Sequence, residues 1–285
     1  MFNVFFLIFV FFFHFSCKEI ISAFSTLEDK KDYYILKNTG GNLKLKILSF
    51  NILASVDLKA LDDGYQVWSE RDEKVISFIK SSQADFIAIQ ECMPGQLDYI
   101  DKKLSAKYYV IENKSYTPDS ILLVKRSDFD LIETGHWILL EDALEFGIRR
   151  IAIWAKVRHL ASKRELLMVS THVDAKSIKK EQIERLFSKL TKHQDSKAPL
   201  FVAGDFNTAP DDDDYKIIMD FGWQDSFLSG TSKVEATYPA KNPRHRIDHI
   251  FYYPENSLEV VSWSVDTQVL SDHLPVTSSF NIPGN

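Results

Sequence analysis

The chain carries, at residues 199–210, the stretch PLFVAGDFNTAP, in which an apolar run leads into a polar loop. The five apolar or small residues after Pro199 have the character of a buried β-strand. Gly204 permits a sharp turn at the end of this strand, so that Asp205 and Asn207, two residues apart, are able to point to one side. An isolated Asp-x-Asn more often forms a turn that closes a strand. A functional interpretation therefore depends on polar groups at other strand ends.

Two such groups occur in the first half of the chain. A predicted strand from Leu43 to Phe50 is followed by Asn51, and a second from Asp85 to Gln90 is followed by Glu91. A helix beginning at Trp68 separates the two strands. This strand-helix-strand order predicts parallel neighbours, whose carboxyl ends meet at one sheet edge. A charged Glu91 after a buried strand needs a partner or a metal ion.

A third strand end carries a histidine. Residues Arg150 to Val157 and Glu165 to Thr171 are predicted to pair as a hairpin, and His172 follows the second strand. A lone histidine in such a place is more often a structural residue. Here Thr171 and Asp174 complete a polar cluster, which favours a functional role.

The remaining pattern alternates short strands and helices. Asp248 is expected to be buried near the start of a strand from Ile247 to Tyr252, and Asp272-His273 precedes the last strand. Asp211 to Asp214 suggests calcium but is better explained as the first turn of a helix. The other predicted elements are helices over Pro94 to Leu104 and Ser177 to Lys192, and strands over Tyr108 to Ile111, Ser120 to Val124, Phe129 to Leu140 and Val276 to Phe280.

Composition sets further bounds. The 285 residues suit one large domain or two small ones, and a hydrophobic content of 45% with 26% charged residues is ordinary for a globular protein. The net charge of -6 supplies no broad basic surface for gripping a nucleic-acid backbone. The charge therefore argues against a nucleic-acid substrate, but it does not exclude one, because bound divalent cations can offset local acidity.

The amino terminus indicates export. Residues 1–17 contain a phenylalanine-rich apolar run of signal-peptide length, which is too short to span a bilayer as a helix. The apolar run, from Val4 to Phe13, is followed by Ser16-Cys17 in a pattern similar to a bacterial lipoprotein signal. A cleaved signal and a lipidated Cys17 that anchors the protein to a membrane therefore both stay open. We expect a secreted, periplasmic or membrane-anchored protein with a linker over residues 18–42 and one domain over residues 43–285. Only Cys92 lies beyond Cys17, so the mature chain would have no internal disulfide.

Taken in order, these motifs resemble those of the endonuclease/exonuclease/phosphatase superfamily from about Lys44 to Phe280. The matching motifs are Ser49-Phe50-Asn51, Gln90-Glu91, Thr171-His172, Gly204-Asp205-Phe206-Asn207, Arg246-Ile247-Asp248 and Ser271-Asp272-His273-Leu274-Pro275. The resemblance implies the α+β deoxyribonuclease-I-like fold, a four-layer α/β/β/α sandwich of two packed mixed β-sheets flanked by helices. It also implies metal-dependent hydrolysis of a phosphoester.

The resemblance assigns a role to each candidate residue. Glu91 is the principal metal ligand with Asn51 and Asp272 nearby, and oxygen ligands of this kind suit Mg²⁺, with Mn²⁺ as a substitute. Asp205 orients or deprotonates the attacking water, and Asn207 donates to a phosphoryl oxygen. His273 hydrogen-bonds the phosphate and is held in one tautomer by Asp248, and His172 faces the phosphate from the opposite side. The expected phosphate contacts are Asn51, Arg150 and Arg246. Arg149 is a weaker candidate, because consecutive strand residues face opposite ways.

Two classes of function remain open: a metal-dependent phosphoesterase, and a catalytically silent binding module of the same fold. The complete residue set favours the enzyme, which we expect to act as a monomer. Its acidity and expected export favour a small or lipid-derived phosphodiester over nucleic acid, and an exported nuclease is the alternative. The basic and aromatic loop from Thr237 to Arg246 is the candidate for substrate recognition, unless Arg246 instead pairs with a nearby carboxylate.

Overall fold

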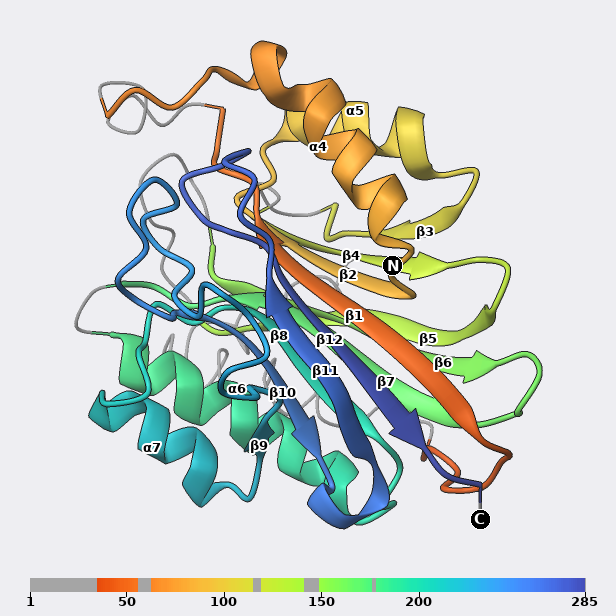
Figure 1. The fold of residues 1–285 in the computed structure, drawn as a ribbon. Coiled ribbons are helices and arrows are strands. Elements are labelled where there is room, and N and C mark those ends of the chain that lie inside the picture. Colours follow the sequence, from red (N-terminus) through yellow and green to blue (C-terminus); the bar gives the residue numbers. More distant parts are fainter. Residues whose placement is uncertain (1–34, 56–62, 115–118, 141–148, 176–177, 285) are drawn as a thin grey trace, which may run out of the picture. The chain divides into compact units, whose positions relative to one another are not determined.

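Two six-stranded mixed sheets form the centre of the unit Leu36–Asn285 (Figure 1). The strands are β1 (Leu43–Asn51), β2 (Phe86–Gln90), β3 (Tyr108–Ile111), β4 (Ser120–Lys125), β5 (Phe129–Ile138), β6 (Ile151–His159), β7 (Glu165–His172), β8 (Leu200–Asp205), β9 (Gln224–Asp225), β10 (Asp248–Tyr253), β11 (Glu259–Val265) and β12 (Val276–Ile282). The first sheet has the order β11-β12-β1-β2-β4-β3, and the second has the order β5-β6-β7-β8-β10-β9. Each sheet contains one parallel pair, β1 with β2 and β7 with β8, and its other neighbours are antiparallel.

This computed structural model describes residues 35–55, 63–114, 119–140, 149–175 and 178–284. The expected signal sequence, with Cys17, lies outside the described residues, as does most of the expected linker. Residues 36–42 lie against the β6–β7 hairpin: the backbone N–H of Lys37 donates to Glu165 Oε2 at 2.8 Å, and that of Gly41 donates to the Ser162 carbonyl at 2.8 Å. Within the described part of the chain, no helix has both the length and the apolar character needed to cross a membrane.

Helices cover the outer face of each sheet (Figure 1). The helices are α4 (Trp68–Ser82) and α5 (Pro94–Leu104) on the first sheet, α6 (Lys179–Gln194) and α7 (Asp213–Asp220) on the second, and a short 3₁₀ turn, η2 (Glu255–Ser257). Strand β1 shows how the alternation of side chains builds the layers. Its Leu45 and Ile47 belong to the core shared with the second sheet, while Leu48 and Phe50 belong to the core shared with α4 and α5. The structure therefore confirms the expected α/β/β/α sandwich.

The predicted elements are present with shifts of one or two residues at most ends. Strands β9 and β11 were not predicted. Strand β9 has two residues, and β11 is an edge strand whose mostly exposed side chains leave Val261 open to solvent, so neither has a continuous apolar signal. Asp213 and Asp214 occupy the first turn of α7, in agreement with the helix interpretation of the aspartate run.

Candidate active site

The parallel strand pairs bring the predicted polar residues to one edge of the sandwich. Asn51, the last residue of β1, pairs with Gln90, the last of β2, so Glu91 follows directly beside Asn51. In the second sheet, Asp205 is in register with His172 on one side and with Asp248 on the other. Strand ends thus place the catalytic candidates, as the sequence pattern predicted.

Asp205 lies at the centre of this cluster and is 1% exposed. Its Oδ2 accepts a hydrogen bond from Asn51 Nδ2 at 3.0 Å and lies 3.5 Å from His172 Nε2 and 3.7 Å from His273 Nε2. Its Oδ1 accepts the backbone N–H of Asn207 at 2.9 Å. The carboxylate is held by neighbours on four segments of the chain, an arrangement suited to a fixed proton acceptor.

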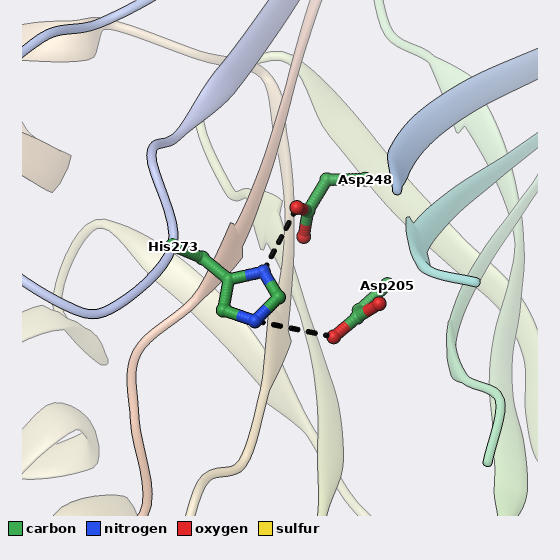
Figure 2. Close-up of side chains that lie close together, drawn as sticks. All are labelled: Asp205, Asp248 and His273. Carbon is green, nitrogen blue, oxygen red and sulfur yellow. Dashed lines mark hydrogen bonds and ion pairs between the residues drawn. The ribbon is translucent and has the colours of Figure 1, made fainter. Parts of the chain in front are cut away.

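His273 is held between two carboxylates (Figure 2). Its Nδ1 lies 2.9 Å from Asp248 Oδ2, and its Nε2 faces Asp205. Burial lowers the pKa of His273, but the charges of Asp248 and Asp205 outweigh burial and hold this pKa well above its usual value. Single ligand atoms of Asp205, Asp248 and His273 lie within 4.8 Å of one another, so the same group is also chemically capable of holding a cation.

His172 has an acidic partner that the sequence analysis missed. His172 Nδ1 lies 3.2 Å from Asp119 Oδ1 and 2.8 Å from Arg150 Nη1, and Arg150 Nη1 donates to Asp119 Oδ2 at 2.7 Å. Burial raises the pKa of Asp119, but Arg150 and His172 lower it by more, so the net pKa lies below its usual value and the carboxylate is ionised. Burial and Arg150 lower the pKa of His172, whereas Asp119 raises it, and the net pKa is raised.

Asp119 stands immediately before β4, which runs antiparallel beside β2 with Ser120 opposite Gln90. The start of such a strand lies at the same sheet edge as the end of its neighbour. An acid placed before an antiparallel strand is thus the sequence signal that marks this residue.

The expected metal ligands form a second group around Glu91. Glu91 Oε1 accepts from Asn51 Nδ2 at 3.0 Å, and Oε2 accepts from the Ala54 backbone N–H at 2.9 Å. The backbone of Glu91 has a φ of 58°, a left-handed conformation unusual for this residue type. Burial raises the pKa of Asp272; His273 lowers it, Glu91 raises it, and the result is a pKa of about 6.

The donor chemistry of this group fits a divalent cation. Asn51 Oδ1 accepts the Leu53 N–H at 3.0 Å, which leaves its second lone pair available. Two carboxylates that repel each other, Glu91 and Asp272, and one amide oxygen are hard ligands of the kind that Mg²⁺ and Mn²⁺ prefer.

Two predicted phosphate contacts are engaged in ion pairs. Arg150 binds Asp119, as described above. Arg246 Nη1 donates to Asp225 Oδ2, and its guanidinium carbon lies 4.1 Å from the centre of the Phe227 ring. The ion pair of Arg246 is the alternative that the sequence had left open. Asn207, in a left-handed conformation at φ 49°, donates through Nδ2 to the Val173 carbonyl at 2.9 Å, and this nitrogen lies 3.4 Å from His172 Nε2.

Solved structures of similar fold cover most of the chain. An endonuclease/exonuclease/phosphatase family protein from Bacteroides thetaiotaomicron is 21% identical, with a TM-score of 0.73 over 85% of this chain and 98% of that chain. A mannosyl-6-phosphatase from Bacteroides thetaiotaomicron VPI-5482 is 22% identical, with a TM-score of 0.71 over 83% and 99%. The human nocturnin catalytic domain, solved with a bound sulfate anion, is 22% identical, with a TM-score of 0.65 over 85% and 97%.

None of the curated proteins matches the chain. The model of the Endonuclease/Exonuclease/phosphatase family matches residues 48–273, a span that contains every candidate catalytic and metal-binding residue described above. The resemblance noted in the sequence motifs is thereby confirmed. The chain belongs to the Endonuclease/Exonuclease/phosphatase family.

Proposed function

We propose that the protein is a divalent-cation-dependent hydrolase of a phosphoester, with Mg²⁺ as its cation and Mn²⁺ as a substitute. The family consists of enzymes that hydrolyse phosphoesters, and this supports the proposed reaction class. The observation that carries the proposal is the position of Asp205, whose Oδ2 faces the Nε2 atoms of two histidines and is tied through Asn51 to Glu91. Such a constellation combines a proton acceptor, two imidazoles and a cation site within one buried cluster.

Each residue has a task in this proposal. Asp205 orients the attacking water and takes its proton. His273, protonated because two carboxylates face it, donates a hydrogen bond to a phosphoryl oxygen, and Asn207 Nδ2 donates to developing charge from the other side. Asp119 and Arg150 hold the ring of His172. A cation on Glu91 and Asp272, when bound, neutralises charge on the phosphoryl group.

The substrate is proposed to be a small or lipid-derived phosphodiester. Solved structures of this fold include a mannosyl-6-phosphatase and a 2',3'-cyclic phosphatase in complex with adenosine-2',3'-vanadate, so the fold accepts phosphoesters of different size. The net charge of -6 favours a compact substrate over a long polyanion, because a polyanion is repelled by an acidic protein. An exported nuclease is the alternative.

A substrate panel with Mg²⁺ tests the activity. Plasmid DNA, RNA, sphingomyelin, phosphoinositides and bis-p-nitrophenyl phosphate are compared with and without excess chelator. We expect turnover of at least one phosphodiester, loss of that turnover in chelator, and a loss of most activity in Glu91→Ala with a raised Mg²⁺ requirement. Glu73→Ala, which removes an exposed carboxylate paired with Lys103, is the control and should behave as wild type. Unchanged turnover in chelator would overturn the metal dependence, and binding without turnover would favour a silent module.

We also propose that residues 1–17 direct export. The support is the apolar run from Val4 to Phe13, which is followed by Ser16-Cys17. Mass spectrometry of the native protein tests this proposal. A mature chain beginning at or after Cys17 is expected, a diacylglyceryl adduct on Cys17 would establish a lipoprotein, and a mass that includes Met1 would reject cleavage.

A further inference from the structure

Arg71, in the first turn of α4, is buried and only 3% exposed. Its guanidinium donates to four backbone carbonyls: Nε to Gln66 at 3.0 Å, Nη1 to Leu270 at 3.3 Å and to Ile52, and Nη2 to Leu53 at 2.6 Å. Among the described residues no carboxylate forms an ion pair with it. A buried cation without an acidic partner is costly, which makes a purely structural explanation incomplete.

The carbonyls that Arg71 binds belong to the loops that carry the expected metal ligands. Ile52 and Leu53 follow Asn51 directly, and Leu270 stands two residues before Asp272. One side chain therefore joins the loop after β1 to the loop before β12. The same guanidinium also binds Gln66, in the segment that leads into α4.

The loop after β1 is itself strained and needs support. Leu53 has a φ of 60°, in the left-handed region that residues other than glycine seldom adopt. Its carbonyl accepts from both Arg71 Nη2 and Gln96 Nε2, the latter at 3.0 Å. The next residue, Ala54, donates its N–H to Glu91 Oε2. The contact with Arg71 thus reaches Glu91 through two residues of backbone.

The charges near Arg71 point to the same site. Burial lowers the pKa of Arg71 to about 10, while the carboxylates of Asp272 and Glu91 raise it. The carboxylates that interact electrostatically with Arg71 are therefore two of the expected metal ligands, Asp272 and Glu91.

We propose that Arg71 is a positioning residue of the cation site, which fixes the loop carrying Asn51 against the loop carrying Asp272 so that both reach the cation bound by Glu91. The inference rests on the proposed function for the presence of that cation. Outer-shell residues that hold ligands in place commonly change metal affinity by about 10–100-fold when they are replaced.

Arg164 provides a matched control. It is 1% exposed, and it donates to the backbone carbonyls of Gly40 at 3.2 Å, Gly41 at 3.4 Å and Pro283. It lies just before β7, whose other end is His172, so the eight residues of that strand place Arg164 about 26 Å from the site. Both Arg71→Lys and Arg164→Lys therefore remove a buried guanidinium that donates to backbone carbonyls. Arg71 lies near the site and Arg164 lies far from it.

The experiment is calorimetric titration of Mg²⁺ into the full-length protein without substrate, for wild type and both variants. We expect both variants to have a lower Tm, because each loses hydrogen bonds to buried carbonyls. Arg71→Lys should weaken Mg²⁺ binding at least about tenfold, whereas Arg164→Lys should stay within about twofold of wild type. Excess Mg²⁺ should restore much of the activity of Arg71→Lys.

A folded Arg71→Lys protein that binds Mg²⁺ as wild type does would overturn the inference while leaving the proposed function intact. Wild type that binds no Mg²⁺ would overturn the cation site itself and this inference with it. If Arg71→Lys is unfolded in buffer, the titration is repeated in sucrose, which favours the compact state. Failure to fold there, while Arg164→Lys folds, also overturns the inference, because Arg71 would then be a determinant of the fold.

Discussion

The rings of His172 and His273 both approach one atom, with their Nε2 atoms 3.5 and 3.7 Å from Asp205 Oδ2. Each ring is held at its other nitrogen by a separate buried carboxylate, Asp119 for His172 and Asp248 for His273. The site therefore contains two carboxylate-histidine pairs that converge on one carboxylate. A ligand that approaches Asp205 Oδ2 therefore meets two imidazole Nε2 atoms.

The first prediction concerns Asp205 and His273, which the proposed function assigns to the reaction and not to the scaffold. Asp205→Asn and His273→Ala should each lower kcat by at least about a hundredfold, the low end for general acid-base groups. His159→Gln, in a histidine at the end of β6 that contacts Ser162, is the control. Circular dichroism should show folded proteins in all three cases. Near-wild-type rates in both site variants would mean that the site has been misplaced.

The second prediction concerns Asp119, a buried carboxylate that contacts His172 and Arg150. Asp119→Asn keeps the shape of the side chain and removes the charge that raises the pKa of His172. The protonated form of His172 should then be lost at a lower pH than in wild type, and kcat should fall about tenfold or more. Rate profiles from pH 5 to pH 9 measure both effects. A profile that keeps its wild-type shape would remove Asp119 from the mechanism.

The third prediction concerns the stability of the metal-free protein. Burial raises the pKa of Asp272 in the folded state to about 6, above the usual value of 3.8, so folding favours the protonated carboxyl. The contribution of this group to stability is complete below the unfolded pKa and is lost as pH rises to about 6. Above pH 6 the free energy of unfolding is therefore lower, by about 2–3 kcal/mol, than it is below the unfolded pKa of this group.

Asp272→Asn should therefore raise the Tm of the chelator-treated protein at pH 7.5, with a gain that shrinks towards pH 4. Mg²⁺ should stabilise wild type at pH 7.5 and stabilise the variant much less. Asp130→Asn, in an exposed carboxylate of β5, is the control and should show neither effect. A Tm gain for Asp272→Asn that is the same at pH 4 and pH 7.5 would contradict the assignment.

The sequence predicted the fold because the buried strands are apolar runs. Strand β8, at the centre of its sheet, is buried along its whole length, and so are its parallel neighbour β7 and strand β2 of the first sheet. Strand β11 escaped prediction because it lies at an edge, where polar and exposed side chains interrupt the pattern. The catalytic candidates were predicted for a related reason: they stand at the ends or just at the starts of strands, and the topology brings those strand ends together.

The residues that were missed act through contacts that are distant in the sequence. Arg71 binds the Leu270 carbonyl across 199 positions, and a carbonyl leaves no trace in the residue pattern. Asp119 meets His172 across 53 positions. Arg246 is a residue whose predicted role the sequence could not decide. In the sequence it is a basic residue near Asp248, and only the folded structure shows that its guanidinium pairs with Asp225.

The last prediction concerns the loop from Thr237 to Arg246 as a recognition element. The Tyr238 ring lies 4.8 Å from that of His273, and Ala240 donates its N–H to the Asp272 carbonyl at 2.6 Å, so the loop borders both halves of the site. Arg244 is exposed and lies beside the side-chain amide of Asn242, so its guanidinium can be reached by an anionic substrate.

Arg244→Ala and Tyr238→Ala should raise KM for the true substrate, and Arg244→Ala should leave kcat on bis-p-nitrophenyl phosphate nearly unchanged. Tyr238→Phe keeps the ring against His273 and should retain most of the wild-type KM. Lys216→Ala, an exposed cation on α7, is the control for loss of charge alone. A steep loss of activity with salt on DNA would indicate many phosphate contacts and favour the nuclease alternative. If KM is unchanged for both alanine variants on every active substrate, the loop has no part in recognition.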